Sequence, residues 1–204
     1  MDSSLRFKNR NFFSGGFANP LTGLSRSLIR WRLAQLAAHL VVALVALVVV
    51  GGATRVMEAG LACPDWPLCY GSFLPGRQMN VQVFLEWFHR LDAFLVAIAL
   101  FVQFFLALVW RSHLPSWFIW TSVSVVLLVF LQGALGALTV LQLLPSDVVT
   151  AHLTLALTLV AVMSGLSQRI QSLGSSDSPL WWRLMGGTAL TAVMGQCVIG
   201  GRMA

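Results

Sequence analysis

The chain has 204 residues, of which 57% are hydrophobic and only 10% are charged, and its formal net charge is +6. A soluble domain of this length would be about one quarter charged, so the composition excludes a conventional soluble protein. The 13 lysines and arginines lie mostly beside hydrophobic stretches, which argues against a nucleic-acid partner. We therefore expect an all-α fold, a polytopic transmembrane helical bundle in the lipid bilayer.

Five hydrophobic stretches are long enough to cross a membrane as helices. They cover residues 33–54, 83–110, 115–142, 148–168 and 181–200. The turns RSHLPS and LLPSDV are short, so neighbouring spans should run antiparallel in an up-and-down bundle. We expect four segments: a basic arm over 1–32, a four-helix half over 33–168, a linker over 169–180 and a further helix over 181–204.

The basic residues are distributed unequally between the two ends of the predicted spans. Nine of the 13 belong to one side: Arg6, Lys8, Arg10, Arg26, Arg30, Arg32, Arg111, Arg169 and Arg183. The positive-inside rule then places the N-terminus in the cytoplasm and the 55–82 loop outside. The first residues lack the short apolar segment of a signal peptide, so we expect a flexible cytosolic arm. A bacterial plasma membrane, or an internal energy-transducing membrane, is the expected location.

Two cysteines, Cys63 and Cys69, lie in the loop sequence CPDWPLC on the side where disulfides persist. A disulfide in so small a ring would stabilise the chain by roughly 2–3 kcal/mol. Two free thiols, or half of a metal site, are the alternatives, although the loop has no histidine to complete a zinc site. Cys197, in the fifth span, is expected to be a small buried residue.

Two of the four histidines are candidates for ligand binding. His89 and His152 lie at similar depths from the outer face, in spans that run in the same direction. Two imidazoles on facing helices suit the axial positions of a haem, or one ligand and one substrate contact. Two separate interhelical hydrogen bonds are the alternative. We expect His39 to make a helix-packing hydrogen bond and His113 to lie in a solvated turn.

Three further ionisable residues surround His89 in the second span. Each such group near the middle of a bilayer costs about 2.5–3.5 kcal/mol on insertion scales, so a cluster indicates function. Glu86 lies on the same helical face as His89. Arg90 could form an ion pair with Glu86 or bind an anionic group such as a haem propionate. Asp92 could fix the tautomer of His89 by a hydrogen bond.

The segments GGATRVMEAGLACPDWPLCYG, FLEWFHR, LQGALGALTV and TAHLTLAL together resemble the haem A synthase family over roughly residues 30–204. The resemblance implies an oxidoreductase that oxidises a methyl group of haem O to the formyl group of haem A for cytochrome oxidase, with water as the oxygen source. It also implies eight spans in two four-helix halves. The N-terminal half, here 33–168, would bind substrate haem O, and the C-terminal half would bind a cofactor haem b.

Carried onto this sequence, the resemblance implies that His89 and His152 are axial ligands of the haem iron and that Glu86 is catalytic. It also matches Cys63 and Cys69 to an outer-loop pair that is redox-active or structural. A carboxylate in a low-dielectric site can stabilise positive charge that develops at the porphyrin edge, or accept protons. Arg90 remains the haem-binding candidate for a propionate.

The sequence departs from the family pattern after VIGGRMA, which echoes VVGGATR at the end of the first span. We expect a truncated chain, with most of the cofactor haem b site in the missing half and activity of this polypeptide alone in doubt. The expected partners are haem O, haem O synthase (protohaem farnesyltransferase) and cytochrome oxidase assembly factors, and a homo-oligomer stays open. The alternative functions are a membrane b-type cytochrome, which binds haem for electron transfer only, and an assembly scaffold.

Overall fold

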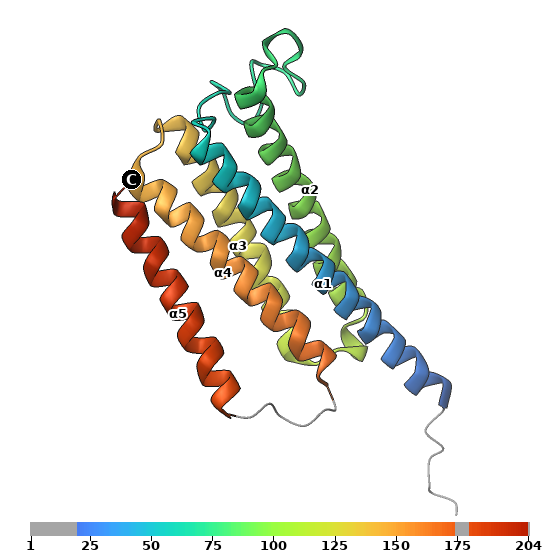
Figure 1. The fold of residues 1–204 in the computed structure, drawn as a ribbon. Helices are drawn as coiled ribbons and strands as arrows, with labels where there is room; N and C mark the ends of the chain where they lie inside the picture. The colour runs from blue at the N-terminus through green and yellow to red at the C-terminus, as the bar shows by residue number, and fades with distance from the viewer. Residues whose placement is uncertain (1–19, 174–179, 204) are drawn as a thin grey trace, which may run out of the picture.

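The computed structural model describes residues 20–173 and 180–203 (Figure 1). Its helices are α1 (Pro20–Val56), α2 (Val81–Val109), α3 (Ser116–Leu141), α4 (Ser146–Gln171) and α5 (Leu180–Met203), with 3-10 turns at Gly76–Gln78 and Arg111–His113. The first four helices are long and apolar enough to cross a membrane, and α5 contains a shorter apolar stretch, Leu184–Gly200. The predicted all-α class is confirmed, and the chain is an integral membrane protein.

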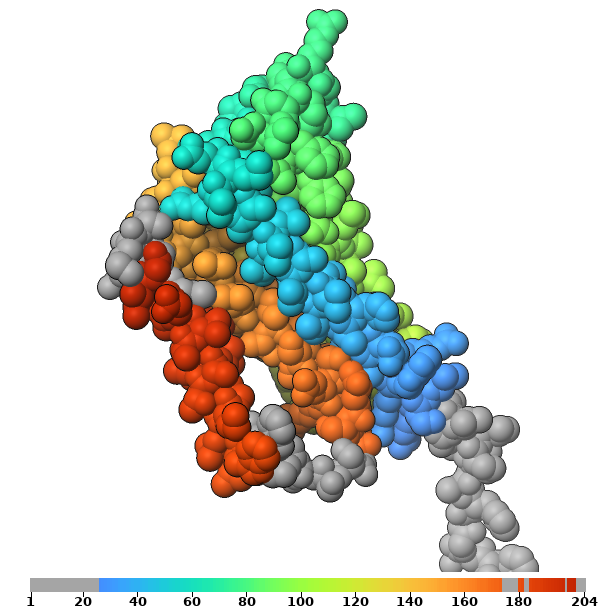
Figure 2. All heavy atoms as spheres, in the orientation of Figure 1, coloured from blue at the N-terminus to red at the C-terminus, as the bar shows by residue number. Residues whose placement is uncertain are grey.

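Helices α1 to α4 form an antiparallel bundle (Figure 1). Both α1 and α3 pack against α2 and against α4, so α2 and α4 occupy diagonally opposite corners. Helix α5 packs along α4 on the outside of this bundle (Figure 2). The α1–α2 loop and the α3–α4 turn lie together at one end, which we call the loop end, and the α2–α3 turn lies at the opposite end.

Local sequence explains where the helices begin. The Asn80 side chain accepts a hydrogen bond of 2.9 Å from the backbone N–H of Val83 and so caps the start of α2. Pro115 and Pro145 directly precede α3 and α4, which is where a residue without an N–H donor is tolerated.

Helix α1 is longer than predicted. It begins at Pro20, so residues 20–32 continue the helix instead of forming a flexible arm. Hydropathy marks only the part of a helix that is buried in lipid, whereas leucine and arginine favour helix on either side of that boundary. Residues 1–19 of the expected arm lie outside the described residues.

The main hydrophobic core fills the half of the bundle nearest the opposite end. Its buried members are Leu33, Ala34, Ala37, Leu40, Leu44, Val96, Leu100, Ala107, Leu114, Phe118, Val125, Leu159, Met163, Leu166 and Ile170. On each helix this cluster stops well before the loop end. Apolar packing by this cluster therefore holds the four helices together at the end opposite the loop end, and the cluster does not extend to the loop end.

We predict that Asn80→Ala destabilises the protein by about 1 kcal/mol, because the first turn of α2 loses its side-chain cap. The measurement is the thermal unfolding midpoint of the detergent-solubilised protein. Asn80→Asp, which keeps the acceptor oxygen, should unfold like the wild type. Equal midpoints for both variants would mean that the cap contributes nothing.

Candidate functional site

His89 and His152 lie at the same level of the bundle, beyond the end of the hydrophobic core. His89 is seven residues before Val96 on α2, and His152 is seven residues before Leu159 on α4. Each histidine is thus about 10 Å along its helix from the nearest core residue. The two imidazoles come from the diagonally opposite helices α2 and α4. The structure therefore brings together the two histidines that the sequence singled out.

The Nδ1 atoms of His89 and His152 are both buried and have no hydrogen-bond partner among the described residues. Buried polar atoms are nearly always paired, so an unpaired one needs an explanation. The prediction that Asp92 accepts a hydrogen bond from the His89 ring is therefore wrong for the Nδ1 atom. The alternative of two separate interhelical hydrogen bonds is present at His152, whose Nε2 atom lies 3.4 Å from Nε2 of Gln132 on α3, and is not found at Nδ1 of His89.

Gln132 on α3 is a neighbour of His152 that sequence reasoning did not identify. Its Nε2 atom lies 3.4 Å from Nε2 of His152 and donates to the backbone carbonyl of His152 at 3.1 Å. Its Oε1 atom is buried without a partner. Gln132 lies 20 residues before the histidine, on the preceding helix, so only the packing of α3 on α4 reveals the contact.

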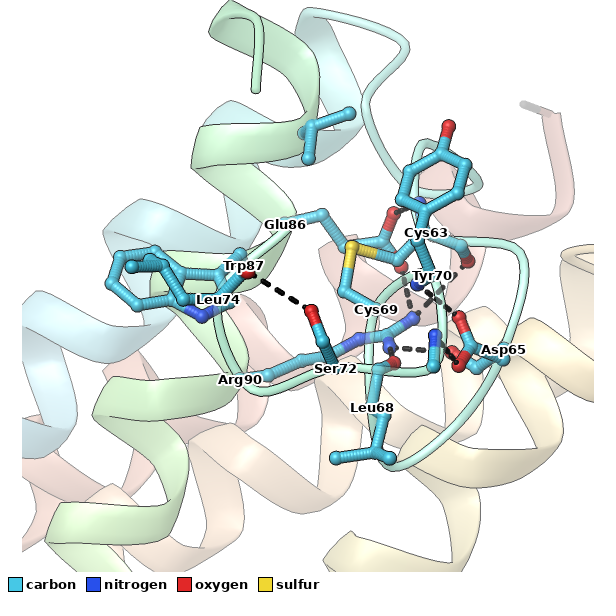
Figure 3. Close-up of a disulfide and its surroundings, with 12 residues drawn as sticks. Cys63, Asp65, Leu68, Cys69, Tyr70, Ser72, Leu74, Glu86, Trp87 and Arg90 are labelled. Carbon is cyan, nitrogen blue, oxygen red and sulfur yellow. Dashed lines mark hydrogen bonds and ion pairs between the residues drawn. A yellow bond between two sulfur atoms is a disulfide. The ribbon is translucent and has the colours of Figure 1, made fainter. Parts of the chain in front are cut away.

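Glu86 and Arg90 on α2 bind the loop that joins α1 to α2, and Figure 3 shows both side chains extending into that loop. The Glu86 side chain is only 4% exposed, and its Oε2 atom accepts from the backbone N–H of Cys63 at 2.7 Å. Its Oε1 atom pairs with the Arg90 guanidinium. The intrahelical ion pair considered from the sequence is thus present.

The Arg90 guanidinium is also a donor to three backbone carbonyls of the loop. Its Nη1 atom donates to Asp65 and Leu68 at 2.6 Å each, and its Nη2 atom donates to Cys63 at 3.4 Å. Charge-assisted bonds of this kind are stronger than neutral ones. Binding of a haem propionate by Arg90 stays a prediction, since the guanidinium already has four acceptors in this structure.

The predicted disulfide joins Cys63 and Cys69, whose Cα atoms lie 4.8 Å apart (Figure 3). Both cysteines are buried against Val83 at the start of α2. Inside the ring, Asp65 accepts from the backbone N–H groups of Tyr70 and Gly71 at 2.6 and 2.8 Å. The loop is thus fixed by the disulfide, by the Asp65 side chain and by the Glu86–Arg90 pair. We call this group of residues the loop clasp.

The remaining expectations have mixed outcomes. His39 is exposed and bonds to the Gln35 carbonyl of its own helix at 2.7 Å, so its predicted role between helices is wrong. The hydropathy of its surroundings did not reveal which face of α1 it occupies. His113 lies in the α2–α3 turn as expected, where its carbonyl accepts from Arg30 at 3.0 Å. The side chain of Cys197 lies outside the described residues.

Residues 34–204 match the COX15-CtaA family, described as cytochrome oxidase assembly protein. The chain belongs to this family. The heme A synthase of Shewanella oneidensis is 29% identical over 176 residues, which cover 76% of this chain and 51% of that relative. The heme A synthase of Chelativorans is 32% identical over 58% of this chain and 35% of the relative, and that of Halalkalibacterium halodurans is 36% identical over 47% and 31%.

The chain therefore spans about half the length, or less, of these curated relatives. No solved structure matches it. The family resemblance predicted from the loop, the FLEWFHR segment and the fourth-span histidine is confirmed.

We predict that Arg90→Gln opens the loop clasp while leaving the disulfide in place, because three carbonyl acceptors lose a charged donor. Loss of bonds to a charged group should speed amide hydrogen exchange across residues 63–72 by roughly tenfold to a hundredfold. Exchange followed by mass spectrometry measures this. Arg77→Gln, at an exposed arginine of the same loop, is the control and should exchange like the wild type. Equal rates in the two variants would contradict the clasp.

Proposed function

We propose that this protein acts in haem A biosynthesis as a haem A synthase, oxidising the methyl group of haem O to the formyl group of haem A. The observation that carries the proposal is the pair of imidazoles at one level of the bundle, on diagonal helices, beyond the end of the core. The curated relatives bear the name heme A synthase, which supports the same reaction.

The residues present fit an iron porphyrin. His89 and His152 supply two imidazole nitrogen donors from diagonally opposite helices, which is the donor set of a bis-histidine haem. Their buried Nδ1 atoms have no partner among the described residues, and the main core ends about two helical turns from them. His89 and His152 would hold substrate haem O, which would supply the iron that they ligate and the methyl group that is oxidised.

Glu86 is the residue that we propose to act on the substrate. It lies one helical turn from His89 on the same face, nearly buried and paired with Arg90. A carboxylate so placed stabilises positive charge at the porphyrin edge, since few waters screen it. Each of two successive oxidations would add an oxygen from water to the methyl carbon and release two electrons and two protons. The resulting geminal diol would lose one water to give the formyl group, and the four electrons would pass to an electron acceptor outside this chain. The loop clasp excludes water from one side of the carboxylate.

The distribution of arginines supports an orientation with the N-terminus in the cytoplasm and the disulfide loop outside a bacterial plasma membrane. Haem O would then bind near the outer surface, in the half formed by residues 33–168. Because the chain spans about half the length of its relatives, we assign no residue here to the cofactor haem b.

We predict that the protein, purified from a host that makes haem O but lacks its own haem A synthase, carries haem O together with haem A or a hydroxylated intermediate. His89→Ala and His152→Ala should each lose bound haem, because one of two axial donors is removed. His39→Ala, at an exposed histidine bonded to its own helix, is the matched control and should keep its haem. Mass spectrometry of extracted pigments and the haem content per protein are the measurements.

The pigment identifies the function. Haem b alone would indicate the b-type cytochrome, and haem O without any oxidised product would remove the oxidation but keep the binding. Protein without haem would overturn the proposal and favour a scaffold.

We predict that Glu86→Gln and Glu86→Ala both retain haem but form oxidised product at least about a hundredfold more slowly, since the negative charge is lost. Partly oxidised haem should accumulate. The glutamine variant can still accept from the Cys63 N–H, so it separates the charge from the loop contact. Wild-type product levels in Glu86→Gln, with loss only in Glu86→Ala, would assign the residue to the loop clasp alone.

A further inference from the structure

Each of the two site histidines lies against a glycine of the neighbouring helix. A Cβ atom built on Gly51 of α1 would stand 2.9 Å from Cε1 of His89, with the two ring nitrogens next at 3.5 and 3.6 Å. A Cβ atom on Gly136 of α3 would stand 3.3 Å from Cε1 of His152. The three atoms nearest to a Cβ atom on Gly51 all belong to the His89 ring, and a Cβ atom on Gly136 would meet only the His152 ring within 4 Å. Each imidazole therefore occupies space that the Cβ atom of any residue other than glycine would fill at position 51 or 136.

The two glycines hold equivalent positions in their helices. Three residues after each comes a threonine whose hydroxyl donates to the glycine carbonyl, Thr54 to Gly51 and Thr139 to Gly136, both at 2.7 Å. Each glycine is also the fifth residue before the end of its helix, since α1 ends at Val56 and α3 at Leu141.

The helix ends after these threonines are also the same. The N–H of Ala59 donates to the Thr54 carbonyl, and the N–H of Leu144 donates to the Thr139 carbonyl, both at 2.8 Å. The residues before them, Glu58 and Leu143, have φ angles of 52° and 60°. This is the Schellman arrangement of a helix C-terminus, and it occurs twice, 85 residues apart.

The bundle thus contains one helical hairpin twice, as α1–α2 and as α3–α4. In each copy the first helix contributes the glycine and the second contributes the histidine. The copies differ in their connections, since the α1–α2 loop carries the disulfide and the α3–α4 turn is short. The two turns touch each other, because a Cβ atom on Gly60 would lie 3.2 Å from the Leu144 side chain. Two equivalent glycine–histidine pairs therefore lie on opposite sides of the bundle.

We propose that Gly51 and Gly136 are positioning residues for the two haem ligands. Without a Cβ atom they let each imidazole lie close against the adjacent helix, which keeps the space between the rings open for a planar macrocycle. This inference rests on the proposed function for the identity of the ligand. Ordinary close packing between helices does not explain the pair, because the atoms that would meet the added Cβ belong to the histidine rings and not to a facing backbone.

The adjacent glycines provide matched controls. A Cβ atom on Gly52 or on Gly133 would meet nothing within 4 Å, although these residues lie in the same helices. Gly51→Ala should push the His89 ring toward the space between the helices, since 2.9 Å is shorter than real contacts of this kind. Gly136→Ala should displace His152 less, because 3.3 Å requires a shift of only a few tenths of an ångström.

The experiment compares Gly51→Ala, Gly136→Ala, Gly52→Ala and Gly133→Ala in the purified protein. We expect haem affinity to fall about tenfold in Gly51→Ala, less in Gly136→Ala and not at all in the two controls, as for groups that orient metal ligands. The absorption spectrum of the bound haem should also change from the bis-histidine form in Gly51→Ala alone or most strongly. Identical spectra and affinities in Gly51→Ala and Gly52→Ala would overturn the inference.

A second measurement separates this inference from the proposed function. Diethyl pyrocarbonate modifies accessible imidazoles, and the site of modification is read by mass spectrometry without any haem. Modification of His89 should be faster in Gly51→Ala than in Gly52→Ala, with the exposed His39 as internal reference. If the wild type binds no haem but this difference is present, the proposed function falls and the positioning role stands. Equal rates at His89 in both variants would contradict the positioning role.

Discussion

A polar group inside a helical membrane bundle has to find its partner within the protein, because lipid offers none. This chain places its buried ion pair and its two site histidines at the loop end. Apolar packing around Phe118 and Met163 holds the other end together, where Gln103, Ser122 and Ser167 are the buried polar residues among those described. At the loop end, Glu86 and Arg90 satisfy each other and the loop backbone. At the level where the core has stopped, His89, Gln132 and His152 are the described residues that keep a buried side-chain nitrogen or oxygen without a partner.

The loop clasp connects the outer loop to the helix that carries a haem ligand candidate. Arg90 follows His89 directly in the chain and donates to the carbonyls of Asp65 and Leu68. Glu86 accepts from the backbone of a disulfide cysteine. The loop and the first turns of α2 therefore form one hydrogen-bonded unit. Removing one partner of such an ion pair leaves the other charge unpaired and strongly destabilises the protein.

The repeated hairpin gives the candidate site its symmetry. Helices α1 and α3 end with the same hydrogen-bond pattern, after Thr54 and Thr139 respectively. The glycine three residues before each threonine lies against the histidine of the following helix. A ligand with two similar faces, such as a porphyrin bound between two imidazoles, suits a site built from two similar halves. The polar neighbours of the histidines are not symmetric, since Glu86 belongs to the first hairpin and Gln132, which contacts His152, belongs to the second.

The sequence by itself determined the class of the protein, the approximate spans and the family, because hydropathy, loop length and motif spacing are local properties. It predicted the Cys63–Cys69 disulfide but left free thiols and a metal site as alternatives, and the structure contains the disulfide. The sequence also selected His89 and His152, since ionisable residues stand out in an apolar helix. Only the tertiary structure decided that α2 and α4 are diagonal, that Arg90 binds carbonyls of the loop, and that Gly51 and Gly136 lie under the imidazoles. A backbone carbonyl and a missing Cβ atom are present at many positions of any chain. They acquire meaning only when folding brings a particular side chain within a few ångströms of them.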